Sequence, residues 1–316
     1  MKAHHTLIGD AGTVHRGVFA ADIPPVLTIK SGDTVEITTL SGDTDDLPDA
    51  SRGFTVRPQH SNLLAKVPAG QGPHLMTGPI AVEGAKPGDE LVVDIQAMEL
   101  EDDWGWNVIK PDKGTLPEDF PDLRRIHVAL DQKRRIVNMP WGLEIPAAPF
   151  FGVIGVAPAP ADGRLTSVIP RSWGGNIDCK HLGAGATLHL PVFNKGALFS
   201  VGDGHAVQGD GEVCITAIET GLRGTVRLSV EKNTGINRPW AETATHVVTM
   251  AFDPDLNIAS KDALREMIKY IVRATGLSAE DAYSLCSVAA DVHVTQLVNV
   301  SKGIHVMLAK TYLRGH

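Results

Sequence analysis

The chain has 316 residues, of which 43% are hydrophobic and 21% charged, and its formal net charge is −8. This length and composition allow a substantial buried core and exclude the disordered, fibrous and disulfide-rich classes. Basic residues occur only in short runs, so the acidic balance argues against nucleic acid or an anionic membrane as a partner.

Short β-rich runs alternate with Gly, Pro, Asp and Ser over the first 230 or so residues. The turn at residues 31–33 precedes a strand pattern at 34–37, and a similar turn at 87–89 precedes one at 90–95. Glycine permits the positive φ that such turns need. The recurrence raises the option of two β subunits related by duplication. Further strands are predicted at residues 187–192, 212–218 and 225–231.

Residues 101–120 form an acidic stretch that places Trp104 and Trp106 among Gly, Pro and Asp. This composition predicts a long surface excursion, with the option that it acts as a lid.

The helical signal comes late in the chain. Apolar residues recur at helical spacing over 263–272, with Ser260 as the predicted N-cap and Gly276 as the stop. Ser278 begins a second predicted helix over 279–289. Strand patterns around a turn at 301–303 then predict a hairpin.

These patterns predict a mainly β fold, sandwich- or barrel-like, with a small C-terminal α/β unit. We expect an N-terminal β-rich domain over residues 1–150, a central β-rich domain over 151–250 that carries the proposed metal site, and the α/β unit over 251–316.

The chain start lacks the apolar core of a signal peptide, and no later run is long and apolar enough to span a bilayer. Cys179, Cys214 and Cys286 are odd in number and never form a Cys-x-x-Cys pair. We therefore expect a cytoplasmic protein with no membrane partner.

Asn176 and Asp178 lie two positions apart, so an extended backbone projects both from one face. A glycine pair before them permits close approach to a ligand, although a turn in which both side chains cap local backbone groups is an equal alternative. A second polar group follows, in which glycines separate Asp203, His205, Gln208 and Glu212. Imidazole and carboxylate together are ordinary ligands of zinc or a similar divalent ion.

Three alternatives remain open for these side chains. Asp203 taken alone also fits a strand-entry turn, and His74, held between Pro73 and the strand that follows, fits either a ligand or a structural role. Cys179 beside His181 also fits a thiol nucleophile, although a bystander thiol is the simpler interpretation.

Three blocks carry a family resemblance: GPHLMTGPIAVEGAKPG at residues 72–88, WGGNID at 173–178 and VFNKGALFSVGDGHAVQGDGE at 192–212. Together they resemble the acetamidase/formamidase family. The resemblance implies a mainly β protein that forms homo-oligomers, with a dimer expected. It also implies hydrolysis of short, linear or cyclic, amides to carboxylate and ammonia.

Carried onto matching positions, the resemblance implies a divalent metal ion, with zinc expected, that activates water and polarises the amide. A carboxylate would carry the proton to the departing amine, and two amide side chains would orient the substrate. The expected metal ligands are His74, Asp178, Asp203 and His205, the expected catalytic residues are Glu83 and Glu219, and the expected substrate-binding residues are Asn176 and Gln208. The alternatives are a thiol-dependent amidase using Cys179 and a non-catalytic β-sandwich protein that binds small molecules.

Overall fold

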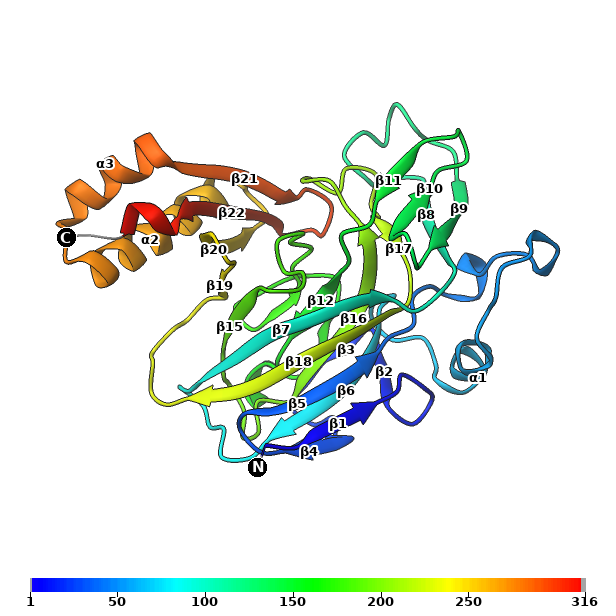
Figure 1. Cartoon of the computed structure of the whole chain (residues 1–316), viewed down its shortest axis with the longest axis horizontal. Helices are drawn as coiled ribbons and strands as arrows, with labels where there is room; N and C mark the ends of the chain where they lie inside the picture. Colours follow the sequence, from blue (N-terminus) through cyan, green and yellow to red (C-terminus); the bar gives the residue numbers. More distant parts are fainter. Residues whose placement is uncertain (1, 314–316) are drawn as a thin grey trace.

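Two large β-sheets make up most of the computed structural model, which describes residues 2–313 (Figure 1). Within this range the first sheet has nine strands, in the order β1 (His4–Leu7), β5 (Asp33–Thr38), β18 (Leu222–Glu231), β7 (Glu90–Leu100), β15 (Thr187–Pro191), β19 (Trp240–Glu242), β20 (His246–Asp253), β22 (Lys302–Ala309) and β21 (Ala290–Gln296).

The second sheet has 11 strands among the described residues. Its main path is β11 (Glu144–Pro146), β10 (Ile136–Asn138), β9 (Arg124–Asp131), β8 (Trp104–Ile109), β17 (Ile218–Glu219), β16 (Phe199–Val207), β12 (Phe150–Gly155) and β14 (Gly174–Asn176). Strand β6 (Leu75–Val82) pairs with β16 and adds β2 (Val14–Arg16) and β4 (Leu27–Ile29). A separate pair joins β3 (Val18–Phe19) to β13 (Leu165–Thr166).

The helices are α1 (Pro58–Lys66), α2 (Leu256–Thr275) and α3 (Ala279–Ala289), with short 3-10 turns η1 (Thr44–Asp46), η2 (Ala50–Arg52), η3 (Pro160–Asp162) and η4 (Lys310–Leu313). Within residues 2–313, none of these helices combines the length and apolarity that crossing a membrane requires.

One apolar core lies between the two sheets. Val35 and Ile37 of the first sheet belong to the same buried cluster as Met76, Ile80 and Phe199 of the second, and all five are fully buried. Burying a side chain of this size stabilises the fold by about 1.5–3 kcal/mol. The predicted mainly β, sandwich-like architecture is confirmed, and so are the predicted turns, where Gly32 and Gly88 adopt φ of 90° and 89°.

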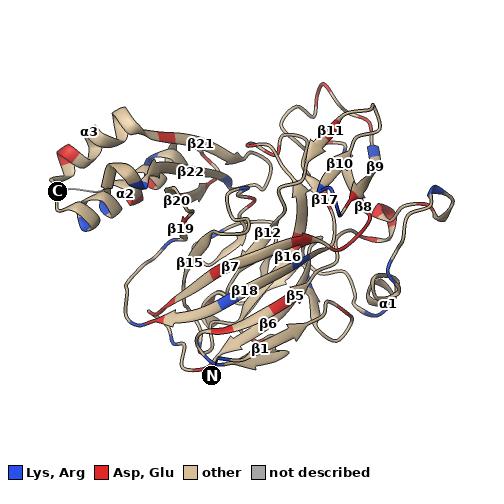
Figure 2. Ribbon diagram, viewed as in Figure 1, with Lys and Arg blue, Asp and Glu red and all other residues tan. Residues whose placement is uncertain are grey.

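Acidic and basic residues occur along strands β5, β18 and β7 (Figure 2). Arg227 on β18, for example, donates to Asp94 on the neighbouring β7, with 2.8 Å between Nη2 and Oδ2. Because such charges prefer water, this face of the first sheet points to solvent while its apolar face covers the core.

The C-terminal residues form the predicted α/β unit with its own core. Met267 and Ile271 of α2 pack against Val247 of β20 and Val306 of β22. The helix starts earlier than predicted: Asp255, rather than Ser260, is the N-cap, and its carboxylate accepts hydrogen bonds from two backbone N–H groups of the first turn. The predicted stop at Gly276 and the predicted start of α3 at Ser278 are both confirmed.

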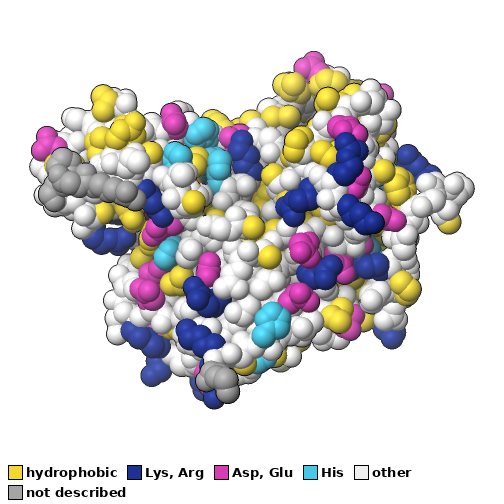
Figure 3. Space-filling model, in the orientation of Figure 1, with side chains coloured by type: hydrophobic (Ala, Val, Ile, Leu, Met, Phe, Trp, Pro, Cys, Tyr) yellow, Lys and Arg dark blue, Asp and Glu magenta, His cyan; other side chains and the backbone are white. Residues whose placement is uncertain are grey.

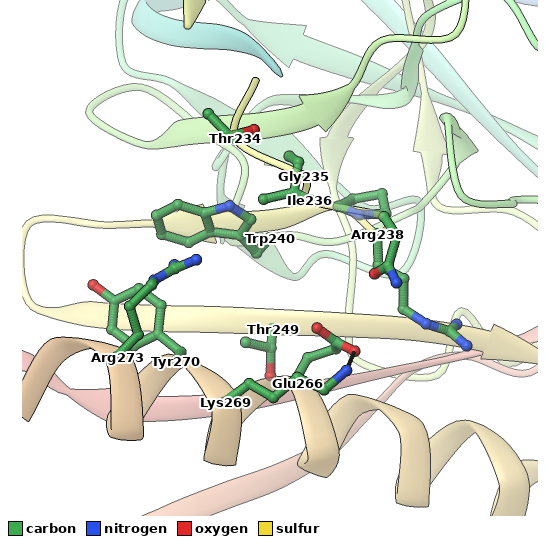
Figure 4. Close-up of a pocket in the computed structure, with 12 residues that line it drawn as sticks. Thr234, Gly235, Ile236, Arg238, Trp240, Thr249, Glu266, Lys269, Tyr270 and Arg273 are labelled. Carbon is green, nitrogen blue, oxygen red and sulfur yellow. Dashed lines mark hydrogen bonds and ion pairs between the residues drawn. The ribbon is translucent and has the colours of Figure 1, made fainter. Parts of the chain in front are cut away.

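A hollow lies between α2 and the segment that leads into β19, lined by aromatic and charged side chains (Figure 4). The ring centroids of Trp240 and Tyr270 are 5.3 Å apart, and the guanidinium of Arg273 lies 5.9 Å from the Trp240 ring. These contacts attach the α/β unit to the main body.

Two sequence predictions about local structure are wrong. Residues 104–109 are not a surface excursion: they form β8 inside the second sheet, and Trp104 and Trp106 are only 1% and 6% exposed. Residues 212–217 are not a strand but a loop, and only Ile218–Glu219 forms β17. The acidic and proline-rich residues around 104–109 led to the prediction of a surface segment. The spacing of apolar residues in the loop 212–217 resembles that of a strand, which led to the second wrong prediction.

The sheets do not divide at residue 150. Strands from residues 1–150 and 151–250 pair with each other in both sheets: β18 pairs with β5 and β7 in the first, and β16 pairs with β6 in the second. Residues 251–316 supply α2, α3 and a hairpin that extends the first sheet. The expected domain boundaries therefore remain a prediction from the sequence. Residues 1–150 and 151–250 both contribute side chains to one hydrophobic core.

His15 on β2 makes the fold sensitive to acid. Its Nε2 lies 2.9 Å from Ser200 Oγ, and burial lowers the pKa of His15 from 6.5 to about 4. The unfolded chain therefore binds this proton more readily, so the contribution to stability is complete above pH 6.5 and is lost as the pH falls toward 4. We expect the free energy of unfolding to fall by up to about 3 kcal/mol across this window. Urea titrations of the chain and of His15→Gln measure it, and an equal decrease in both would contradict the assignment.

Candidate active site

His205 lies at the centre of a buried polar cluster. It sits on β16 with no exposed surface, and its Nε2 is 3.3 Å from Asp203 Oδ2 and 3.2 Å from Glu219 Oε1. Asp178 Oδ1 lies 3.9 Å from the same nitrogen. Asp203 and His205 are two apart on β16, and Glu219 is paired with His205 from β17, so strand register brings these side chains to one face.

The hydrogen bonds of Gln208 determine which nitrogen of His205 carries the proton. Gln208 Nε2 donates to the Asp178 backbone carbonyl at 2.8 Å, which leaves Gln208 Oε1 facing His205 Nδ1, also at 2.8 Å. An amide oxygen only accepts, so Nδ1 must be the donor. The other nitrogen, Nε2, faces the carboxylates and has no hydrogen-bond partner among residues 2–313. It therefore needs either a second proton or a cation.

Asp178 is held by two asparagines. It follows β14 with φ of 53°, and its side chain accepts a hydrogen bond from Asn299 Nδ2. Asn176 satisfies its hydrogen bonds when its amide nitrogen donates to Asp178 Oδ2 and Asp203 Oδ2, each at 3.2 Å, and its oxygen accepts from Asn299 Nδ2 at 2.9 Å. The two asparagines thus fix both carboxylates relative to His205.

Glu219 and Glu212 complete the acidic wall of the cluster. Glu219 Oε1 accepts from the Ala217 backbone N–H at 3.0 Å, and Glu219 is only 3% exposed. Glu212 comes from the loop at residues 208–217 and is buried, and its Oε2 has no hydrogen-bond partner within the described part of the chain. Both side chains line the same cavity.

His74 approaches the cluster from the start of β6. Its Nδ1 lies 2.8 Å from Ser167 Oγ, which orients the ring so that Nε2 is 3.7 Å from Asp203 Oδ2. Burial lowers the pKa of His74 below its ordinary value. The neighbouring Asp203 carboxylate acts in the opposite direction and only partly offsets burial.

Burial and crowding separate the pKa values of the cluster. Burial raises the pKa of Asp178 to about 7 and that of Glu219 to about 8. Burial also acts to raise the pKa of Asp203, but His74 and His205 hold it below its usual range. For His205 burial disfavours the charged ring, yet Glu219 and Asp203 raise the pKa well above its ordinary value. Such opposed shifts in one cleft are typical of functional sites.

The cluster fits a divalent cation by its donor chemistry. Two overlapping groups share His205, one with Asp178 and Glu212 and the other with Asp203 and Glu219, and in each group the candidate ligand atoms lie within 4.8 Å of one another. Imidazole nitrogen and carboxylate oxygen are ligands that zinc accepts. A cation would also offset the negative charge of four buried carboxylates.

Gly152 on β12 keeps space open beside the cluster. A Cβ at this position would lie 2.6 Å from Asp178 Oδ1 and 2.6 Å from His205 Cε1. Contacts that short would move the carboxylate or the ring, so only glycine allows both side chains their present positions.

The cluster forms one wall of a cavity of about 270 Å³. The rest of the lining is mixed: Lys110 and Trp106 come from around β8, Val298 and Val300 from the β21–β22 turn, and acidic and hydroxyl side chains come from Ser41, Asp43, Asp46 and Thr216. A small polar molecule with an apolar substituent matches such a lining.

The structure brings together seven of the eight residues that the sequence singled out: His74, Asn176, Asp178, Asp203, His205, Gln208 and Glu219. Glu83 is not among them. It is exposed at the opposite end of β6 from His74 and lines a different hollow, because an eight-residue strand separates its ends by about 26 Å.

Gln208 has a different place from the expected one. Both ends of its amide are used by His205 and by the Asp178 carbonyl, and it orients these residues rather than facing the cavity. Glu212 belongs to the predicted glycine-rich polar group but was left out of the expected metal ligands. Asn299 was missed, because it lies in a hairpin turn and gave no sequence signal of its contact with Asp178.

Cys179 is poorly suited to be a nucleophile. It is fully buried, and burial raises the pKa of its thiol to about 12. A thiolate is the reactive form, so a shift in this direction works against thiol catalysis.

Comparison with known proteins agrees with this fold. A formamidase from Methylophilus methylotrophus is 26% identical to the chain in an alignment 360 positions long, gaps included, that covers 88% of this chain and 84% of that protein. The crystal structure of an acetamidase from Bacillus halodurans is 30% identical and superposes with a TM-score of 0.84, covering 97% of this chain and 98% of the other. An acetamidase structure from Yersinia enterocolitica is 26% identical with a TM-score of 0.87, covering 99% and 94%.

Fold, site and relatives together define an amidohydrolase. The model of the acetamidase/formamidase family matches residues 10–163 and 161–311, two segments that fit the expected duplicated β units. The chain belongs to the acetamidase/formamidase family.

Proposed function

We propose that the chain hydrolyses the C–N bond of small amides of the formamide and acetamide kind to carboxylate and ammonia, with a zinc ion held by His205, Asp178 and Asp203. The carrying observation is the buried His205 Nε2, which lacks a hydrogen-bond partner in residues 2–313 and faces carboxylates at 3.2 to 3.9 Å beside a cavity. Glu212 and His74 are the next ligand candidates by position.

A bound zinc ion supplies Lewis acidity, which polarises a carbonyl oxygen and makes water more acidic. The residues of the chain supply the remaining functions. Asn176 lines the cavity, and the second lone pair of its amide oxygen remains to accept a hydrogen bond from the substrate N–H, which limits the orientations the scissile bond adopts. Gln208 holds His205 in the tautomer that leaves Nε2 free.

Glu219 is the proposed proton carrier. It lines the cavity beside His205, and with a pKa raised by burial to about 8 it exchanges a proton readily near neutral pH. It accepts a proton from the attacking water and delivers it to the nitrogen of the departing amine, which leaves as ammonia.

Metal removal tests this proposal. Dialysis against a chelator is expected to stop ammonia release from formamide, acetamide and propionamide, because the carbonyl is then no longer polarised. Adding zinc should restore at least half of the rate. Ammonia is measured with a coupled enzymatic assay, and bound zinc by elemental analysis.

The Cys179→Ala variant is the matched control and should keep its rate within about threefold, since the thiol is buried away from the chemistry. Full activity without metal, combined with loss in this variant, would instead establish the thiol mechanism. Amide binding by calorimetry with no ammonia from any substrate would indicate a binding protein.

We also propose a homodimer in the cytoplasm. Strand β21 is an edge of the first sheet and its Val292 is exposed, as is Val288 at the end of the preceding helix α3, which is 82% exposed. A second copy would cover this apolar edge. Sedimentation velocity is expected to give twice the chain mass, and a Val288→Lys variant should shift it toward the monomer; a monomeric parent chain would reject the dimer.

The proposed cytoplasmic location rests on the cysteines. Within residues 2–313, Cys179, Cys214 and Cys286 are all free thiols, the state that a reducing compartment maintains. Cell fractionation checks the location.

A further inference from the structure

A second group of histidines lies outside the His205 cluster. It consists of His181 after β14, Asp210 in the loop at residues 208–217, and His293 and His305 on the hairpin strands β21 and β22. The rings of His293 and His305 stack at 4.9 Å with an interplanar angle of 7°, and the His181 ring meets His305 edge-on at 5.1 Å. Figure 3 shows histidine side chains gathered at the surface where β21 and β22 run.

Two ring nitrogens of this group are buried without partners. His305 is fully buried and its Nδ1 lies 2.8 Å from Thr295 Oγ1, so that the ring orientation is fixed. The Nε2 atoms of His305 and His181 both lack a hydrogen-bond partner in the range 2–313. Leaving two such atoms unpaired costs free energy, about 1–3 kcal/mol for each. Packing of neutral histidines alone does not explain why both nitrogens are left unpaired where the two rings meet.

Asp210 supplies the carboxylate at that point. One ligand atom each from His181, Asp210 and His305 lies within 4.8 Å of the others. Asp210 Oδ2 is 2.9 Å from Lys180 Nζ and 3.5 Å from His293 Nδ1, and the side chain is 26% exposed. Ions can therefore reach the group from solvent on the side of the partly exposed Asp210, whereas His305 is buried on the other side.

We propose that His181, Asp210 and His305 form a second site for a divalent first-row cation such as zinc. Two imidazoles and one carboxylate suit zinc, with the remaining coordination position left to water. Burial lowers the pKa of His305 to about 3, which keeps its ring neutral, as a metal ligand must be. The simpler alternative is a Lys180–Asp210 ion pair beside stacked histidines with no cation.

The position of this site points to a structural role. Its ligands come from three segments that also carry residues of the His205 cluster: Asp178 precedes His181, Glu212 follows Asp210, and Asn299 lies between the strands that bear His293 and His305. A cation here ties these segments together, so it stabilises the fold and positions the catalytic side chains without contacting the substrate.

The test uses the full chain, stripped with a chelator and reloaded with zinc alone. Zinc per chain is counted by elemental analysis after desalting, and the melting temperature is followed with and without zinc. His181→Gln and Asp210→Asn alter partly exposed positions, while His127→Gln on β9 is the matched control with similar burial. Both site variants should hold one zinc fewer than the parent chain and lose part of the zinc-induced rise in melting temperature, and His127→Gln should do neither.

Asp203→Asn separates this site from the catalytic one. It should lose its activity and one zinc yet keep the zinc-induced rise that His181→Gln loses. If His181→Gln and Asp210→Asn both hold as much zinc as the parent chain, the second site is rejected. The proposed function is unaffected by that result. If circular dichroism shows that one variant misfolds, the other decides, and anomalous diffraction at the zinc edge must place an ion among the histidines or the site is rejected.

Discussion

Replacing His205 with Gln is expected to reduce kcat/KM for small amides by more than about 100-fold. Losing a residue that only supports a metal ligand costs up to about 100-fold, and losing a proposed ligand should cost more. The reason is that Gln removes the buried Nε2 that the carboxylates of Asp203 and Glu219 surround. Ammonia release and zinc content are measured on the same preparation. The variant should lose one zinc per chain along with its activity.

His189→Gln is the control for this change. His189 is a histidine of the first sheet, paired with Glu90 and stacked on Trp240, and it takes no part in the cavity. Its activity should stay within about threefold of the parent chain. If His205→Gln kept a parent-like rate with parent zinc content, the central role of His205 would be rejected.

Gly152→Ala is expected to inactivate the chain while leaving its fold largely intact. The added Cβ would lie 2.6 Å from both Asp178 Oδ1 and His205 Cε1, so the carboxylate and the ring must move apart. Overpacking of this kind costs about 1–3 kcal/mol of stability. A displacement of about 1 Å is enough to lower catalysis by about 100-fold. The observables are kcat and the urea midpoint.

Gly183→Ala is the matched substitution, because its Cβ would stand 3.4 Å from the Pro149 carbonyl oxygen, an ordinary contact. It should retain parent-like kcat. Equal activity of Gly152→Ala and Gly183→Ala would show that the space beside Asp178 is not needed for the reaction.

The sequence predicted elements whose signals are local. Ser278 and Gly276 mark helix boundaries through backbone hydrogen bonds and φ angles, and Gly32 marks a turn in the same way, so these predictions were confirmed. Trp104 and Trp106 misled because their acidic neighbours suggested solvent, whereas tertiary pairing placed them in β8.

Residues of the candidate site could be predicted where they lie in the segments that resemble the family, at 72–88, 173–178 and 192–212. Contacts between segments far apart in the sequence could not be predicted. Asp178 and His205 lie within such blocks, and the structure brings them together. Glu83 lies in a block too, but strand length carries it away from His74. Asn299 reaches Asp178 across a sequence separation of 121 residues, a contact that no local pattern encodes.

The interleaving of strands in both sheets has a consequence for biogenesis. Strand β18 must pair with β5 and β7, which precede it by well over 100 residues, and the cluster needs side chains from His74 to Asn299. Pairings of such long range form slowly, after the loops between them have closed. A chain emerging from the ribosome therefore cannot assemble the complete His205 cluster until Asn299 has been synthesised.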